Sequence, residues 1–367
     1  MINRENEMIR LNRRTFIAGA GATLALPWLA NRASAADPLK VGYIYVGPIN
    51  DGGWNTAHEA GRQAMLKALG DKVTSVYVEN VAEGPDSERV MRDLVNQGCK
   101  LIYATSVGYN DFALKVAKAF PDVKVEMCTG WNHADNLSNY NIRFHQARSV
   151  FGTMAGMLSK SGVGGYIATF PVPEVVSGIN SFTLAARKVN PNFKTKVIWV
   201  NTWYDPAKEA DAARALIDQG VEVLTQHTDS PAAVQVAESK SIPTFGQGSD
   251  QSQFGPKMCK SSSLDLWGSF YTNRTQAVLD GKWKPDDTYW GFKEGALGIS
   301  PIVNVPDDVK AAAEKVQAGW LDGSYNVYAG PIKAQDGTEK AAAGAALDDG
   351  AILGMDWLVE GVDGKLG

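Results

Sequence analysis

A group of polar and aromatic side chains follows the first apolar run of the chain, at Asn50, Asp51, Trp54 and Asn55. The run itself, residues 41–46, has the composition of a buried parallel strand, and it ends at a Gly-Pro pair. In an open α/β sheet, ligands bind in the loops at the carboxyl ends of the strands. A Trp in such a loop can stack on a flat polar ring, while carboxylate and amide groups hydrogen-bond the edge of that ring. The spacing predicts a ligand site in this loop.

The next helix is expected to start at Thr56, because Thr56 and Glu59 have the spacing of a capping box. If these two residues cap the helix, Asn55 is free to bind a ligand. The alternative is that Trp54 packs into the core and that the neighbouring Asn and Asp residues only cap the helix.

Further candidates stand in other segments that are expected to follow strands. They are Ser106, Tyr109, Glu174, Trp203, Thr228, Asp229 and Asp250. Trp267, at the start of an expected helix, is a further candidate. Glu174 can accept hydrogen bonds from the edge of a base, or it can favour a helix N-terminus. Asp250 can bind a ligand, or it can shape an Asx turn. His227 also lies just past a strand, and both a ligand contact and a structural role stay open for it.

The sequence carries no signature of an enzyme. It has no G-x-S-x-G motif, no P-loop and no H-E-x-x-H motif, and its four His residues are scattered. Cys99, Cys128 and Cys259 form no C-x-x-C pair, so no metal site, redox motif or cofactor is indicated. Buried, inert thiols are expected, although one disulfide stays open. Aromatic and carboxylate residues without a nucleophile–base pair favour a binding protein over a catalyst.

Residues 1–35 have the pattern of a twin-arginine signal peptide. Arg13 and Arg14 precede an apolar stretch over residues 16–30, and an A-x-A cleavage site ends at Ala35. The stretch is too short to span a membrane stably, and no Cys follows it to carry a lipid anchor. The pattern predicts a protein exported to the periplasm by the twin-arginine route, without a membrane anchor.

The charge balance argues against nucleic acid or an anionic membrane as a partner. The chain has a net charge of −4, and residues 1–35 hold five Arg and two Glu, so the remainder carries −7. This remainder, about 330 residues, is long enough for two domains.

Strand and helix patterns alternate along this remainder, which predicts βαβ units and a parallel sheet. Strands are expected at residues 41–46, 73–78, 101–104, 123–127, 166–169, 197–200, 221–225 and 242–245. Helices are expected at residues 56–69, 87–97, 111–120, 146–159, 175–190, 206–219, 231–239, 266–279 and 308–318.

The two halves of this pattern match each other. Residues 94–102 align with residues 216–224, and each stretch reads as a helix end, a Gly C-cap and a strand. The match predicts two equivalent lobes, with Ser106 and Thr228 in corresponding loops. Facing strand ends would form a ligand cleft between the lobes.

A resemblance to a known family is carried by residues 47–62, by Arg143-Phe144 with Gly152-x-x-Ala155-Gly156, by residues 170–180, 190–191, 205–208, 218–220 and 248–251, and by residues 293–295 with 300–301. In these segments the chain resembles the basic membrane protein family of ABC-transporter solute-binding proteins, the purine-nucleoside receptor group. The resemblance implies an α/β type I periplasmic-binding fold with two Rossmann-like lobes that close on a ligand. The lobes would be residues 37–144 plus 265–292 and residues 145–264 plus 293–367. It also implies a monomer that delivers a small molecule to a membrane permease and its ATPase.

The resemblance assigns base stacking to Trp54 and base hydrogen bonding to Asn55. Many members stack the other face of the base on a Phe, which falls at Gly178 in this chain. That role would then pass to Trp203 or Trp267.

The resemblance also implies an Asp and a Lys for a ribose. The nearest positions here are Gly248 or Asp250 for the Asp, and Leu264 or Asp265 for the Lys, which is therefore missing. A free purine base, with adenine favoured, is the expected ligand. A nucleoside, or a sugar bound by the same fold, is the alternative; an exported nucleoside hydrolase would need a carboxylate cluster that the sequence does not show.

Overall fold

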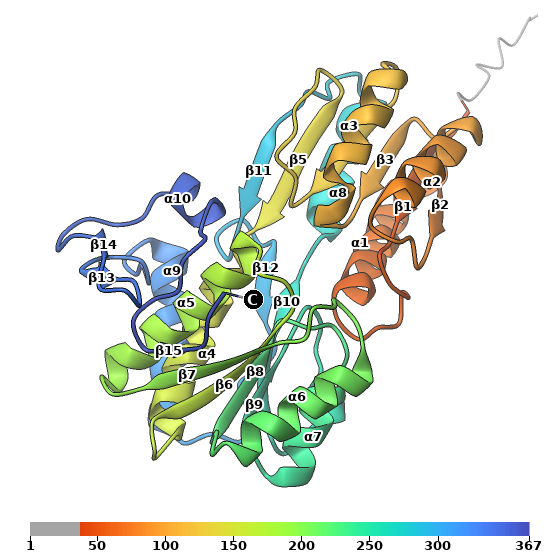
Figure 1. Cartoon of the computed structure of the whole chain (residues 1–367). Helices are drawn as coiled ribbons and strands as arrows, with labels where there is room; N and C mark the ends of the chain where they lie inside the picture. Colours follow the sequence, from red (N-terminus) through yellow and green to blue (C-terminus); the bar gives the residue numbers. More distant parts are fainter. Residues whose placement is uncertain (1–36, 367) are drawn as a thin grey trace, which may run out of the picture. The chain divides into compact units, whose positions relative to one another are not determined.

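The computed structural model describes residues 37–366, so the predicted signal peptide lies outside the described residues. Two sheets with helices on both faces make up the fold (Figure 1). This confirms the predicted α/β class and the parallel character of the sheets. All three cysteines are free and buried.

The first sheet is entirely parallel, in the order β11-β5-β4-β3-β1-β2. Its strands are β1 (Leu39–Ile44), β2 (Val73–Val78), β3 (Leu101–Ala104), β4 (Lys124–Cys128), β5 (Leu137–Ile142) and β11 (Asp287–Trp290). Its helices are α1 (Trp54–Leu69), α2 (Pro85–Asn96), α3 (Asn110–Ala119) and α8 (Gly268–Leu279). Tyr43 packs in the cluster that holds α1 and α8, whereas Ile44 packs in the cluster that holds α2 and α3, because successive side chains of a strand face opposite sides.

The second sheet has the order β12-β10-β9-β8-β6-β7-β15, with only β12 antiparallel to its neighbour. Its strands are β6 (Val163–Ala168), β7 (Lys194–Trp199), β8 (Val223–Gln226), β9 (Thr244–Gly246), β10 (Cys259–Asp265), β12 (Leu297–Ile299) and β15 (Val362–Asp363). Its helices are α4 (Phe144–Leu158), α5 (Pro173–Val189), α6 (Pro206–Asp218), α7 (Ala232–Lys240) and α9 (Asp307–Asp322). A short pair, β13 (Ile332–Lys333) and β14 (Glu339–Ala341), and α10 (Asp349–Leu353) complete the fold.

The predicted internal match has a structural counterpart. The order β2-β1-β3-β4-β5 in the first sheet repeats as β7-β6-β8-β9-β10 in the second. The aligned segments lead into β3 and β8, the third strand of each half. Gly98 and Gly220 end the preceding helices with φ of +93° and +84°, a conformation that glycine adopts without strain.

The strands β5, β10, β11 and β12, and the short strands β13, β14 and β15, are missing from the sequence-based alternation. The buried strand β10 carries three consecutive Ser residues, and β5 carries Ser138, Asn139 and Asn141. Hydrogen bonding compensates for this polarity: Ser261 Oγ donates to the Ser300 carbonyl at 2.7 Å, and Ser138 Oγ to the Asp286 carbonyl at 2.6 Å.

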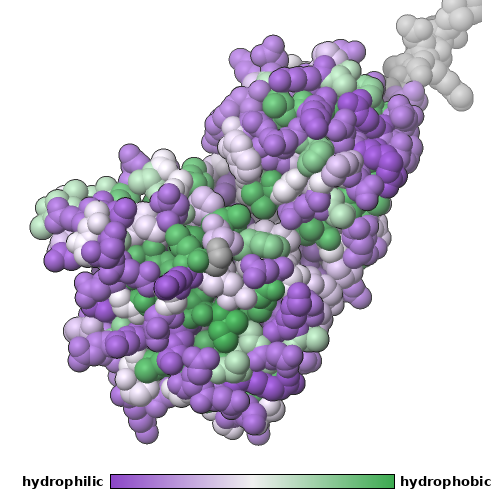
Figure 2. Space-filling model, viewed as in Figure 1, coloured by the Kyte–Doolittle hydropathy of each residue, from purple (hydrophilic) through white to green (hydrophobic). Residues whose placement is uncertain are grey.

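The chain crosses between the two sheets three times, between β5 and β6, between β10 and β11, and between β11 and β12. Figure 2 shows hydrophobic side chains gathered near the middle of one face, with hydrophilic residues around them. No helix within residues 37–366 is long and apolar enough to cross a membrane.

Candidate functional site

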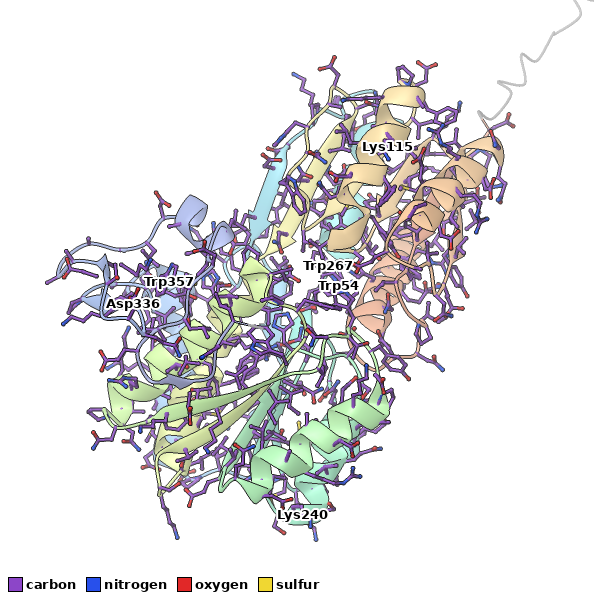
Figure 3. The ribbon with its side chains drawn as sticks, in the orientation of Figure 1. Trp54, Lys115, Lys240, Trp267, Asp336 and Trp357 are labelled. Carbon is purple, nitrogen blue, oxygen red and sulfur yellow. The ribbon has the colours of Figure 1, made fainter. Side chains whose placement is uncertain are left out.

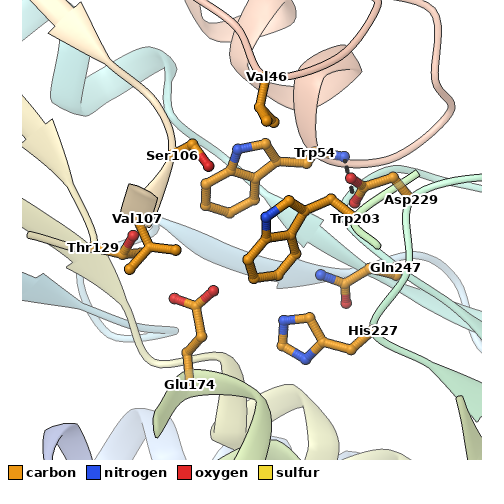
Figure 4. Close-up of a pocket in the computed structure, with 10 residues that line it drawn as sticks. All are labelled: Val46, Trp54, Ser106, Val107, Thr129, Glu174, Trp203, His227, Asp229 and Gln247. Carbon is orange, nitrogen blue, oxygen red and sulfur yellow. Dashed lines mark hydrogen bonds between the residues drawn. The ribbon is translucent and has the colours of Figure 1, made fainter. Parts of the chain in front are cut away.

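A pocket with an enclosed volume of about 20 Å³ lies between the strand ends of the two sheets (Figure 4). This space is smaller than that of small-molecule sites, about 300–1,000 Å³, so a ring-sized ligand would fit only with the pocket walls further apart. The first sheet's segments contribute Val46, Trp54, Ser106, Val107 and Thr129. The second sheet's segments contribute Glu174, Trp203, His227, Asp229 and Gln247. The wall therefore combines one indole and several polar groups from the segments of each sheet.

Five predicted binding residues line this pocket: Trp54, Ser106, Glu174, Trp203 and Asp229. The sequence analysis did not include Val46, Val107, Thr129 or Gln247, and it left His227 open. A usable signal exists for His227 and Gln247, because each directly follows a strand of the second sheet, β8 and β9.

Trp54 is held in place by its own side of the pocket. Its indole Nε1 donates to the Thr105 carbonyl at 2.7 Å. The indole also contacts His58 edge-on, with ring centroids 4.4 Å apart, and Trp267 at 5.7 Å. Because its polar atom is already paired, Trp54 offers the pocket only its aromatic surface.

The cap of α1 differs from the prediction. The helix begins at Trp54, and the Asp51 carboxylate accepts hydrogen bonds from the backbone N–H groups of Gly53, Asn55 and Thr56 at 2.9–3.0 Å. The capping box of Thr56 and Glu59 does not form. Asp51 replaces it because the turn folds back and brings the carboxylate under the first helical turn.

Asn55 is consequently not free. It is fully buried, and its Nδ2 donates to Asp51 at 2.7 Å, while its Oδ1 has no partner among the described residues. Asp51 and Asn55 lie behind the pocket wall and position Trp54 from there.

Glu83 links the two sides of the pocket, although no sequence pattern singled it out. One carboxylate oxygen accepts from Ser106 Oγ at 2.5 Å and from the Gly108 N–H at 3.0 Å. The other accepts from Trp203 Nε1 at 3.3 Å. This contact orients the second indole of the pocket from the loop of the first sheet.

The second side of the pocket is acidic. Burial, with the charges of Asp265 and Glu83, raises the pKa of Glu174 to about 8. Burial, with the charges of Asp51 and Glu209, also raises the pKa of Asp229 well above its usual range. Asp229 accepts one hydrogen bond from the Trp54 N–H at 3.3 Å.

His227 and Gln247 complete this side. Burial and the nearby Arg148 lower the pKa of His227, so its imidazole is neutral. Tyr166 contacts its Nδ1 at 3.3 Å. Gln247 Oε1 accepts from Ser263 Oγ at 3.1 Å and from Arg148 Nη2.

Five other predicted residues stay away from the pocket wall. Asn50 and Asp250 are exposed, and Asp250 accepts from the Ser252 N–H, as in the Asx-turn alternative. Tyr109 is buried and donates to the Val81 carbonyl at 2.6 Å. These side chains are committed to their own loops.

Thr228 and Trp267 are the remaining two. Thr228 follows β8, as predicted, but it is fully buried, and its neighbour Asp229 reaches the pocket instead. Trp267 stacks on His58, with centroids 4.7 Å apart and an interplanar angle of 9°. Trp267 therefore supports His58, and His58 in turn contacts the indole of Trp54.

Gly178 has no room for an aromatic side chain. A Cβ at this position would lie 2.7 Å from the Tyr166 hydroxyl. The second sheet's aromatic residue in the pocket is Trp203, which comes from the segment between β7 and α6.

The pocket adjoins a wider outer cavity of about 530 Å³. Both spaces share Val107, Thr129 and Glu174, and the outer one extends to Trp131 and Tyr289. Within residues 37–366, no group of three or more His, Cys, Asp and Glu side chains is arranged to hold a metal ion.

Comparison with known proteins agrees with this architecture. Residues 39–324 match the Bmp family, described as ABC transporter substrate-binding protein PnrA-like. A purine-binding protein of Brucella abortus is 52% identical over 345 residues, covering 94% of this chain and 99% of that protein. A putative ABC transporter glucose-binding protein of Haloferax volcanii is 34% identical, covering 91% and 82%.

Solved structures show the same fold. An ABC transporter solute-binding protein from Aeropyrum pernix superposes with a TM-score of 0.68 at 17% identity, covering 86% of this chain and 95% of that one. The chain therefore belongs to the Bmp family of ABC transporter substrate-binding proteins, as the sequence resemblance predicted. Its family indicates a protein that binds a small molecule and works with a permease, rather than an enzyme.

Proposed function

We propose that this protein is the periplasmic receptor of an ABC importer and that it binds a free purine base, with adenine favoured. The observation that carries the proposal is the pairing in one pocket of two indoles, Trp54 and Trp203, with buried carboxyl groups. Flat heterocycles stack on aromatic faces, and their N–H groups need acceptors at the ring edge. The 52% identical purine-binding relative supports the same ligand class.

The proposal includes the route and the moving parts. The protein is exported through its twin-arginine signal, is released near Ala35 and acts as a monomer. Its lobes are residues 37–144 plus 265–292 and residues 145–264 plus 293–367, and they close on the ligand. Hydrogen bonds across the pocket, such as Ser249 Oγ to the Gly52 carbonyl at 2.6 Å, support such a closed arrangement.

A nucleoside is the second candidate, and the outer cavity favours it. A base between Trp54 and Trp203 would have space beyond Glu174 for a sugar. The base remains the first proposal because no Lys faces either cavity, whereas carboxyl groups do.

Calorimetric titration of ligand-free protein with adenine, guanine, adenosine, ribose and glucose tests the proposal. Adenine is expected to bind most tightly, and the Trp54→Ala variant is expected to lose that binding. Adenosine binding as tightly as adenine would replace the base by the nucleoside. Binding of ribose or glucose alone would overturn the purine assignment.

A further inference from the structure

Two charged side chains near the pocket, Arg148 and Asp265, are buried with polar atoms that have no partner. Arg148 is 1% exposed and Asp265 is 4% exposed. Nε and Nη1 of Arg148 and both carboxylate oxygens of Asp265 have no hydrogen-bond partner among the described residues. Among the ion pairs found within residues 37–366, none joins these two groups within 4.0 Å. Buried charges in proteins are normally paired, so this arrangement requires an explanation.

Both side chains lie where the chain crosses between the sheets. Arg148 is in α4, the helix that follows the first crossing, and Asp265 is the last residue of β10, before the second. Gln247 connects Arg148 to the pocket, because it lines the pocket wall and contacts Arg148 Nη2. Tyr166 further fixes the guanidinium, which lies 5.7 Å from the ring centroid.

Asp265 is fixed in a similar way. Its backbone N–H donates to the Gly248 carbonyl at 2.9 Å, next to Gln247. Its charge raises the pKa values of Glu174 and Asp229, both of which line the pocket. Asp265 therefore lies close enough to the pocket for its field to act on the groups in the wall.

A ligand that satisfies both groups must offer an acceptor to Arg148 and an N–H donor to Asp265. An aminopurine presents this combination on a single edge, since its exocyclic amine donates and the adjacent ring nitrogen accepts. A 6-oxopurine presents a carbonyl oxygen in place of the amine. That oxygen would face a carboxylate, and two acceptors facing each other disfavour binding.

We propose that Arg148 and Asp265 determine specificity by reading the amino edge of a bound 6-aminopurine. Asp265 accepts a hydrogen bond from the exocyclic amine, and Arg148 donates one to the neighbouring ring nitrogen. This inference rests on the proposed function. It adds two residues that would set the preference for adenine and extends that preference to aminopurines over oxopurines in general.

The test compares adenine with hypoxanthine at pH 8 in the full mature protein. In the wild type, adenine is expected to bind at least about tenfold more tightly. The Asp265→Asn variant keeps the shape of the side chain but adds an N–H donor, which suits the carbonyl oxygen of hypoxanthine. The ratio of the two Kd values should therefore shift toward hypoxanthine by about tenfold or more. Asp250→Asn, at an exposed acid of the loop between β9 and β10, is the matched control and should leave the ratio unchanged.

A folded Asp265→Asn variant with an unchanged Kd ratio would overturn the inference. If that variant does not fold, a ligand series on the wild-type protein decides instead. N6,N6-dimethyladenine keeps the ring nitrogens but has no exocyclic N–H, and it should bind at least about tenfold more weakly than adenine. Equal binding of the two ligands would refute the role of Asp265. A wild-type protein that binds no purine at all would refute the proposed function itself.

Discussion

The two sides of the pocket are built in opposite ways. On the first side, Trp54 is pinned by a hydrogen bond to Thr105 and by ring contacts with His58. On the second side, Glu174 and His227 have pKa values shifted by burial, and Arg148 and Asp265 behind them keep unpaired atoms. The first side fixes its indole by its own contacts, and its unpaired atoms, Asn55 Oδ1, His58 Nε2 and Trp267 Nε1, belong to neutral groups. The second side leaves a guanidinium and a carboxyl group with unpaired atoms.

This difference separates two tasks of a receptor. A wall whose aromatic ring is already fixed has little to rearrange when a ligand arrives, so it supplies shape and stacking surface at little entropic cost. An unsatisfied wall gains hydrogen bonds only from a ligand with matching groups, and a mismatched ligand leaves buried charges unpaired. Affinity for a flat ring should come mainly from the first wall, and discrimination among rings mainly from the second.

Removing the stacking surface should have the largest effect. Trp54→Ala is expected to weaken adenine binding at least about thirtyfold, because an aromatic hot spot contributes roughly 2 kcal/mol or more. Calorimetry measures the change. Trp357→Ala is the matched control, since Trp357 lies away from Trp54 on the C-terminal segment (Figure 3). An unchanged Kd for adenine in a folded Trp54→Ala protein would show that this side chain has only a structural role.

Keeping the two walls apart should have the next largest effect. A Cβ at Gly53 would lie 2.6 Å from the Asp229 carbonyl oxygen and 2.7 Å from its Cα. Gly53→Ala should therefore prevent full approach of the walls and weaken adenine binding by about tenfold. X-ray scattering with saturating adenine should show a larger radius of gyration than the wild type has.

Gly350→Ala, on the surface helix α10, provides the comparison for that variant, because its Cβ meets no atom within 3.4 Å. If Gly53→Ala binds adenine as Gly350→Ala does, contact between the walls is not needed for binding.

Removing the support of the first wall should have a smaller effect on binding and a clear effect on stability. Asp51→Ala deletes the acceptor of three backbone N–H groups and should cost roughly 1–2 kcal/mol of unfolding free energy. Adenine binding should weaken only a few-fold, because the Thr105 contact of Trp54 remains.

Asp205→Ala is the matched control for the cap. Asp205 caps α6 through the Lys208 N–H at 3.1 Å, outside the pocket wall. In a denaturant titration, the Asp205→Ala variant should lose about as much unfolding free energy as Asp51→Ala, and it should keep the wild-type Kd for adenine. Equal Kd values for both variants would contradict a positioning role for Asp51.

The unsatisfied wall predicts the smallest effect, a pH dependence of stability. Burial raises the pKa of Asp265 from 3.8 to about 7, although Arg148 opposes the shift. Between these values the folded state holds a proton that the unfolded state has lost, so stability falls as pH rises from about 4 to 7. The Tm of the ligand-free protein should fall by a few degrees over this window.

Asp265→Asn removes this titration and should flatten the dependence of Tm on pH. The comparison separates the contribution of Asp265 from that of Glu174. The raised pKa of Glu174 also makes stability fall as pH rises, up to about pH 8. Parallel Tm profiles for the wild type and the variant would show that the Asp265 carboxyl is not held protonated in the fold.

The sequence predicts the parts of the fold in which periodic apolar runs dominate. The strands β2 and β3 have the predicted bounds, and the helix–Gly–strand match anticipates the repeated strand order. The amino-acid sequence does not reveal β10, because the Ser residues of this strand are paired by hydrogen bonds to distant segments. A single segment's polarity says nothing about such partners.

The same limit applies to the pocket. Trp54, Glu174 and Asp229 were predicted because each stands in a segment that follows a strand. Whether such a side chain faces the pocket depends on one hydrogen bond, as Tyr109 shows by pairing with Val81. Glu83 was not predicted because its role arises only when the two sides of the pocket meet.

The paired indole N–H of Trp54 also bears on how ligand preference diverges among relatives. An aromatic face without a free hydrogen-bond donor does not fix how a stacked ligand is rotated in its own plane. Such a face therefore accepts purine rings and the apolar faces of sugars alike. A receptor can then keep this half of the pocket while the other half decides which class of ligand it binds. Exchange of ligand class during evolution would concentrate in the segments after β6, β8, β9 and β10, while the turn before α1 stays constrained by its own geometry.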